Sequence, residues 1–156
     1  MLRPLAHEPF YNSGSWTAET LGLCVGWTCL KGSFGDCLPI WNEAKDVCLI
    51  FSGEHFADAA ESDALRAKGH QFEPGNASYL VHLYEETGPA FLERLNGWFS
   101  GLLVDLREQK LLLFNDRSGT NRLYWYENEQ NFYFASEAKA LLKVLPQARS
   151  LNYSSL

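Results

Sequence analysis

The sequence predicts an α+β domain in which two antiparallel β-sheets pack face to face and helices cover their outer faces. Three observations favour this fold. A helical middle section separates two strand-rich sections, and the second half contains two pairs of short strands joined by polar turns. The run Val47–Phe51 is apolar throughout, which is typical of a strand buried on both faces. Sheets that pack together beneath outer helices provide such burial.

The first part of the chain predicts two strands. Residues 1–20 carry repeated turn signals and are expected to be irregular. A strand is expected over Leu21–Thr28 and a loop over Gly32–Asp36. The buried strand over Val47–Phe51 is expected to stop at Ser52-Gly53, where the chain becomes polar.

The middle of the chain predicts three helices. The first covers Asp58–Lys68, and Gly69 is placed to end it. The second covers Ala77–Thr87, because Asn76 is a good N-cap and the apolar residues that follow share one helical face. Pro89 suits the first turn of a third, shorter helix.

The second half predicts two hairpins and a closing helix. The first hairpin pairs Phe99–Leu106 with Leu111–Asn115, and the second pairs Leu123–Tyr126 with Phe132–Ala135. The aromatic side chains of the second hairpin alternate as in paired strands, and we expect them to pack in the core. Ser136 is expected to be the N-cap of the last helix.

Composition limits the classes of function. The chain has 156 residues, which suits a single domain with a sizeable core. Its formal net charge is -6 with only 13 Lys and Arg residues, which argues against nucleic acid as a partner. The sequence shows neither an apolar run long enough for a bilayer nor a signal-peptide pattern, so no membrane partner and a cytoplasmic location are expected.

The cysteine pattern predicts no metal site. The four cysteines are Cys24, Cys29, Cys37 and Cys48; they form no CxxC pair, and no histidine follows at zinc-finger spacing. Cys48 lies in an apolar run and is expected to be a small buried side chain. Cys24 and Cys29 are likewise expected to be packed side chains, with a role as substitute nucleophiles as the alternative.

Several short motifs, in order along the chain, resemble one known family. These are Gly69–Phe72, His82–Gly88, Leu95–Phe99, Asp116–Gly119 and Phe134–Glu137. Together they resemble the amino-terminal class II glutamine amidotransferase domain of the asparagine synthetase family. The resemblance implies a four-layer αββα sandwich of the amino-terminal-nucleophile (Ntn) hydrolase type. It also implies one domain over residues 1–156, truncated at its start, with the family's first strand, Met-Cys-Gly, lying upstream of Met1.

The resemblance implies a definite chemistry. In such domains a cysteine thiol attacks the side-chain amide of glutamine, its free α-amine acts as the base, and ammonia passes to a synthetase domain. An Asn-Gly pair shapes the oxyanion hole, and an arginine, a glutamate and an aspartate hold the charged ends of glutamine. ATP and magnesium would belong to a synthetase domain absent from this chain, so no cofactor is expected within it.

The glutamine-pocket positions implied by the resemblance are Ser52, Gly53, Glu54, Asn76, Ala77 and Val25. Serine stands where the family has the oxyanion-hole asparagine, Val25 where it has the arginine, and Ala77 where it has the aspartate. Each charge-assisted contact is worth about 1.5–3 kcal/mol, so both losses weaken glutamine binding strongly. No catalytic residue is identified, because the amino-terminal cysteine is absent.

Three accounts of the function stay open. The chain is predicted to be the amidotransferase-like domain of an asparagine-synthetase-type protein, inactive as an isolated chain. Alternatively it is a degenerate, non-catalytic scaffold that binds a partner, or a module that self-associates through an open strand edge. Glutamine or another small molecule, a synthetase domain or partner chain, and a second copy are the corresponding partners.

Individual polar residues carry open interpretations of their own. Glu54 is either a ligand-binding residue or an ordinary loop acid. Asp116 and Arg117 are expected to pair or to cap a turn, with a substrate role as the alternative. His70 and His82 are expected to be structural.

Overall fold

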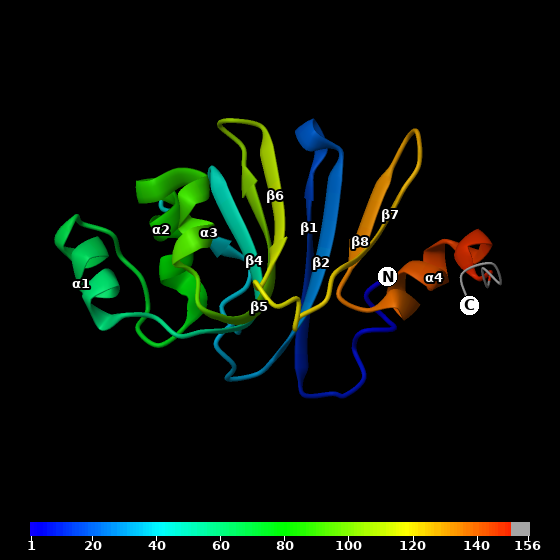
Figure 1. The fold of residues 1–156 in the computed structure, drawn as a ribbon, viewed down its shortest axis with the longest axis horizontal. Helices are drawn as coiled ribbons and strands as arrows, with labels where there is room; N and C mark the ends of the chain where they lie inside the picture. The colour runs from blue at the N-terminus through cyan, green and yellow to red at the C-terminus, as the bar shows by residue number, and fades with distance from the viewer. Residues whose placement is uncertain (151–156) are drawn as a thin grey trace.

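The computed structural model describes residues 1–150, and its centre is a four-stranded antiparallel sheet. The strand order is β3 (Ile40–Trp41), β4 (Val47–His55), β5 (Gly97–Asp105) and β6 (Lys110–Asn115). In Figure 1 the long strands of this sheet stand side by side near the middle of the molecule. The protein is therefore a mixed α/β fold built on antiparallel pairing.

Helices cover one face of this sheet (Figure 1). They are α1 (Ala59–Ala67), α2 (Leu80–Thr87) and α3 (Phe91–Arg94), with the short 3-10 turns η2 (Ala77–Tyr79) and η3 (Gly88–Ala90) between them. The predicted Asn76 cap is confirmed, because its side chain accepts a hydrogen bond from a backbone N–H group of the first turn of η2. Asp58, expected as the first residue of its helix, caps α1 in the same way. The three predicted helices are thus all present.

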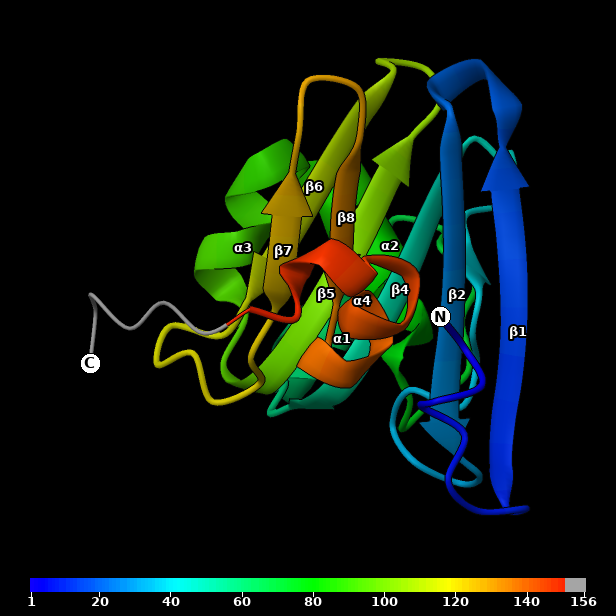
Figure 2. The same cartoon turned by 90° about the vertical axis from the view of Figure 1, so that its right-hand side faces the viewer.

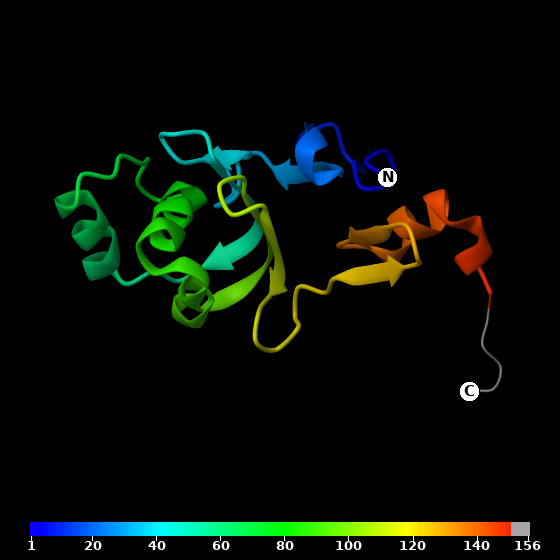
Figure 3. The same ribbon diagram turned by 90° about the horizontal axis from the view of Figure 1, so that it is seen from above.

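Two β-hairpins lie on the other side of the central sheet (Figures 2 and 3). The first joins β1 (Tyr11–Ala18) to β2 (Leu23–Leu30) through η1 (Glu19–Leu21), and the second joins β7 (Tyr124–Glu127) to β8 (Phe132–Ala135). Helix α4 (Ala138–Val144) packs on the second hairpin and is followed by η4 (Pro146–Ala148). Within residues 1–150 each hairpin is a separate two-stranded sheet.

Strand β4 separates two hydrophobic cores. Its residues Val47, Leu49 and Phe51 belong to the core beneath the helices, which we call the helix-side core. Cys48 and Ile50 belong to a smaller core shared with β2 and β5, which we call the inter-sheet core. Because successive side chains of a strand point to opposite faces, both faces of this apolar run are buried, as predicted.

The prediction that residues 1–20 are irregular is confirmed for residues 1–10 but wrong for residues 11–18. Tyr11–Ala18 forms strand β1, which pairs antiparallel with β2 over its whole length. The turn-forming residues here are compatible with a strand because pairing satisfies the backbone, and Gly14 lies opposite Trp27. A Cβ at Gly14 would come within 2.5 Å of the Trp27 ring, so the glycine makes room for the tryptophan.

Two further expectations are corrected at the carboxyl end. Helix α4 has Glu137 rather than Ser136 at its N-cap position, and no side chain caps it. The aromatic residues of β7 and β8 are paired but only partly covered: Trp125 is 63% exposed and Phe132 is 52% exposed, whereas Tyr133 and Phe134 pack against cores. Alternation determines which side chains share a face of the hairpin, whereas burial depends on whether another layer covers that face.

No helix among residues 1–150 combines the length and the apolar character needed to cross a membrane.

Candidate functional site

The polar end of β4 is the first candidate site. Ser52 and Glu54 continue the face of β4 that carries Cys48 and Ile50, so they point toward the hairpin side of the sheet. Both are exposed, whereas Cys48 and Ile50 are buried. The apolar covering of this face therefore ends where the chain becomes polar.

A cavity of about 270 Å³ opens beside Ser52. Its position between β4–β5 and the β7–β8 hairpin follows from its lining residues, which are Ser52, Ser100, Thr120, Asn121, Arg122, Tyr124 and Ser136. Ser52 and Ser100 are register partners on the adjacent strands, so their side chains lie next to each other. The residues that line this space are all polar or amphipathic, which suits a small polar ligand.

A buried aspartate shapes the loop that lines this cavity. The Asp116 carboxylate accepts backbone hydrogen bonds from Ser118 at 3.1 Å, Thr120 at 3.0 Å and Asn121 at 2.8 Å. These hydrogen bonds hold the pKa of the Asp116 carboxyl below its usual value, and the bond from Asn121 has the largest effect. The predicted turn-capping role of Asp116 is confirmed, and its consequence is to fix the loop beside β4.

Gly53 allows β4, β5 and this loop to approach closely. Its φ is +109°, a conformation that favours glycine, and a Cβ here would lie 2.0 Å from the Trp98 carbonyl oxygen. The same Cβ would lie 2.6 Å from the Asn121 side-chain nitrogen. A glycine at this position is therefore required by geometry, whatever ligand the cavity takes.

The other predicted pocket residues lie apart from the cavity. Val25 is 4% exposed and packs in the inter-sheet core, whereas Ala77 is fully buried in the helix-side core. Asn76 uses its side-chain oxygen to cap η2. The structure thus brings Ser52, Gly53 and Glu54 together and places Val25 and Ala77 in cores on opposite faces of the sheet.

Three of the four thiols, those of Cys29, Cys37 and Cys48, are poorly activated. Burial raises the pKa of Cys48 to about 12, and burial with a hydrogen bond to Asp36 raises that of Cys29 to about 11. Burial also raises the pKa of Cys37. Cys24 is exposed, so its prediction as a packed side chain is wrong, because it lies on the outward face of β2. Cys48 is fully buried, as predicted.

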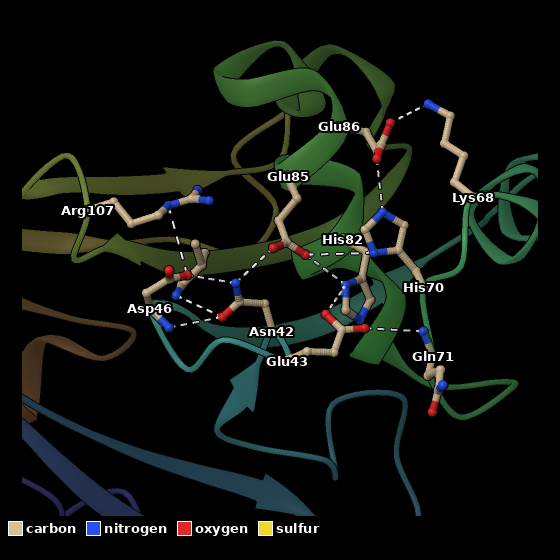
Figure 4. A network of polar contacts seen from close by, with 11 residues as sticks. Asn42, Glu43, Asp46, Lys68, His70, Gln71, His82, Glu85, Glu86 and Arg107 are labelled. Atoms are coloured by element: carbon tan, nitrogen blue, oxygen red, sulfur yellow. Dashed lines mark hydrogen bonds and ion pairs between the residues drawn. The ribbon is translucent and has the colours of Figure 1, made fainter.

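A second cluster was not predicted from the sequence. Glu43, His70, His82 and Glu85 each bring one nitrogen or oxygen to a common point, with these atoms all within 4.8 Å of one another (Figure 4). The available signal was the i, i+3 spacing of His82 and Glu85 on a predicted helix. Glu43 and His70 come from loops, and only the tertiary structure brings them to that helix.

The sequence matches a family of known domains over most of its length. The profile described as "Glutamine amidotransferase domain" matches residues 31–143. Asparagine synthetase [glutamine-hydrolyzing] 3 of Arabidopsis thaliana is 35% identical over 105 residues, which cover 66% of this chain and 18% of that protein. Asparagine synthetase B [glutamine-hydrolyzing] of Escherichia coli is 35% identical over 111 residues, covering 68% of this chain and 19% of that protein. This chain therefore spans less than a fifth of these relatives.

Proposed function

The chain belongs to the glutamine amidotransferase domain family, and from this premise we propose that it is the amidotransferase-type domain of a larger amide-forming protein. In this proposal the isolated chain binds a small amino acid or amide in the cavity beside Ser52 but does not hydrolyse glutamine. The family relationship supports an amino acid or amide as the ligand, and the cavity beside Ser52 is the binding site that we propose for it.

The observation that carries the proposal is the lining of the cavity. By the resemblance, Ser52 stands at the family's oxyanion-hole position, and Arg122 on the facing loop is among the residues that line the same cavity. A guanidinium is well suited to the α-carboxylate of an amino acid, and such a charge-assisted contact is worth about 1.5–3 kcal/mol. Arg122 would thus take over the charge recognition that Val25 cannot supply.

The state of the thiols supports the absence of hydrolysis. Attack on an amide needs a thiolate close to the substrate, and a raised pKa keeps a thiol protonated at neutral pH. Burial raises the pKa of Cys29, Cys37 and Cys48. Within the described residues, no cysteine is among those lining the cavity. The alternative function is a non-catalytic scaffold that binds a partner chain or a synthetase domain. Any ATP and magnesium chemistry would belong to that synthetase domain.

The finer architecture is part of this proposal. We propose that the two hairpins are parts of one layer in a four-layer αββα sandwich, as the family resemblance implies. The order of the elements supports it, because α1–α3, the central sheet, the hairpins and α4 follow one another across the molecule (Figure 1). Within residues 1–150, β2 and β8 each pair with one strand only, so each has an edge that could accept a further strand.

Calorimetric titration with glutamine, run beside an ammonia-release assay, tests the function. We expect weak binding and no ammonia above the background of the buffer. Arg122→Gln should lower the affinity about 10–100-fold, as loss of one charge-assisted contact predicts, while the exposed Arg3→Gln serves as the matched control. Ammonia release by the unmodified chain would contradict the proposal, and absence of any binding would favour the scaffold.

A further inference from the structure

A compact cluster of imidazole and carboxylate groups lies on the helix-covered side of the central sheet, away from the cavity at Ser52. Three segments build it (Figure 4). Glu43 lies in the turn after β3, His70 in the segment that follows α1, and His82 and Glu85 on α2. No part of this cluster serves the proposed amidotransferase function.

The side-chain nitrogen and oxygen atoms of the cluster lie close enough together to share one metal ion. His82 Nδ1 lies 2.9 Å from Glu85 Oε2 and 3.5 Å from Glu43 Oε2, and His70 Nδ1 lies 3.9 Å from Glu85 Oε2. Ligands about 2.0–2.1 Å from a tetrahedral zinc ion are roughly 3.4 Å apart. Small side-chain movements would therefore bring all four atoms to coordination distance.

A second set of contacts holds the four groups in orientation. Glu86 Oε1 lies 2.9 Å from His70 Nε2 and is itself paired with Lys68, so Nδ1 of His70 is left facing the cluster. Asn42 Nδ2 donates to Glu85 Oε1 at 2.8 Å, and the Gln71 backbone N–H donates to Glu43 Oε1 at 3.3 Å.

These partners are those of a metal site's outer shell. A carboxylate that accepts from the far nitrogen of a ligating histidine fixes its tautomer and raises its basicity. Here Glu86 has that position relative to His70. In Glu43 and Glu85, Oε1 accepts a hydrogen bond from outside the cluster, and Oε2 faces His82.

The charges of the cluster also favour a cation. His82 Nδ1 faces two carboxylate oxygens, although one ring nitrogen carries at most one proton. A divalent ion would satisfy both carboxylates at once.

We propose that Glu43, His70, His82 and Glu85 bind a divalent transition-metal ion, with Zn²⁺ the best match. Two imidazole nitrogens with two carboxylate oxygens suit zinc, whereas Ca²⁺ and Mg²⁺ prefer oxygen ligands alone. The His82 side chain is 3% exposed and forms the floor of the site, while that of Glu43 is 54% exposed and leaves a solvent path for the ion.

The site would fasten α1 to the rest of the domain. Leu65 is the buried residue of α1, so this helix contributes little to the core. His70 follows α1 closely, and coordination would tie its segment to α2 and to the turn after β3. Metal binding therefore stabilises the domain and is structural, because all four ligands come from the protein.

Titration of the metal-free, tag-free chain with zinc chloride tests the proposal. We expect one Zn²⁺ per chain with a dissociation constant of about 10 μM or lower, and an unfolding temperature that rises by about 5 °C or more at saturation. Co²⁺ should give the visible absorption of a tetrahedral site. His70→Gln and Glu43→Gln, chosen because neither side chain is fully buried, should each lower the affinity at least about 10-fold.

Two further variants test whether zinc binds at this cluster rather than at another exposed histidine. Glu86→Gln should weaken zinc binding about 10–100-fold without changing the stoichiometry, as loss of an outer-shell partner does. His7→Gln, an exposed histidine outside the cluster, should bind zinc like the unmodified chain. Circular dichroism of each variant verifies folding. Unchanged zinc affinity in His70→Gln and Glu43→Gln, or no binding by the unmodified chain, would overturn the proposal.

Discussion

The two faces of the central sheet are covered in different ways. On the helix-covered face, aromatic rings interlock: the Phe91 ring lies 5.6 Å from those of both Tyr84 and Phe114, edge to face. On the hairpin-covered face, the inter-sheet core is smaller, and the rings of Trp125 and Phe132 stack on each other while remaining largely exposed.

The helix-covered face contributes more to stability, whereas the hairpin-covered face has room for the polar cavity. A closely packed face contributes most of the free energy of folding, because each buried side chain loses its contact with water. The face with an incomplete cover has room for the polar cavity beside Ser52. The proposed metal site lies on the tightly packed side, where rigid elements can hold ligands in position.

The largest expected effect compares two phenylalanines. Phe91→Ala should lower the free energy of unfolding by about 3–5 kcal/mol, because Phe91 is fully buried and its loss leaves a cavity. Phe132→Ala, of the same size but 52% exposed, should cost less than about 1 kcal/mol. Urea denaturation measures both. Equal losses of unfolding free energy in the two variants would show that Phe132 is buried in solution.

The next comparison concerns two glycines with similar backbone angles. Gly53 has φ +109° and no space for a Cβ, whereas Gly69 has φ +100° and open space around it. Gly53→Ala should therefore cost about 3 kcal/mol, from strain and a steric clash, and Gly69→Ala about 1 kcal/mol from strain alone. Thermal denaturation of the two variants checks this, and a similar small loss in both would mean that β4 and the Asp116 loop do not pack closely.

The smallest expected effect is the pH dependence of Asp105, which links the sheet to α2. Burial acts to raise its pKa, but hydrogen bonds from Arg107, the Glu108 backbone and Tyr84 lower it to about 2. A lowered pKa in the folded state contributes stability above the unfolded value near 3.8, and this is lost as the pH falls toward 2.

We expect this contribution to be roughly 1–2 kcal/mol, since Arg107 is partly exposed and solvent screens its charge. Urea denaturation between pH 5 and pH 2, for the unmodified chain and Asp105→Asn, measures it. The two stabilities should converge as the pH falls. Asp63→Asn, at an exposed position on α1, is the control, and a constant difference across this range would contradict the expected pKa.

Much of the fold could be predicted from local signals. The apolar run over Val47–Phe51 indicated a strand buried on both faces, and Asp58 and Asn76 marked helix starts, because caps and periodicity act over a few residues. Strand β1 was missed because its turn-forming residues become a strand only through pairing with β2. The expectation that this strand stops at Ser52-Gly53 is wrong, because β4 stays paired with β5 and continues to His55.

By itself, the sequence determined the family, the Asn76 helix cap and the strands β4, β5 and β6 of the central sheet. Only the tertiary structure decided which residues meet: it placed Val25 and Ala77 in separate cores, brought Arg122 to the cavity of Ser52, and gathered Glu43 and His70 around α2. The physical reason is the separation along the chain of the residues that interact. Caps, turns and alternation depend on neighbours along the chain, whereas a binding site depends on side chains from distant segments that packing brings together.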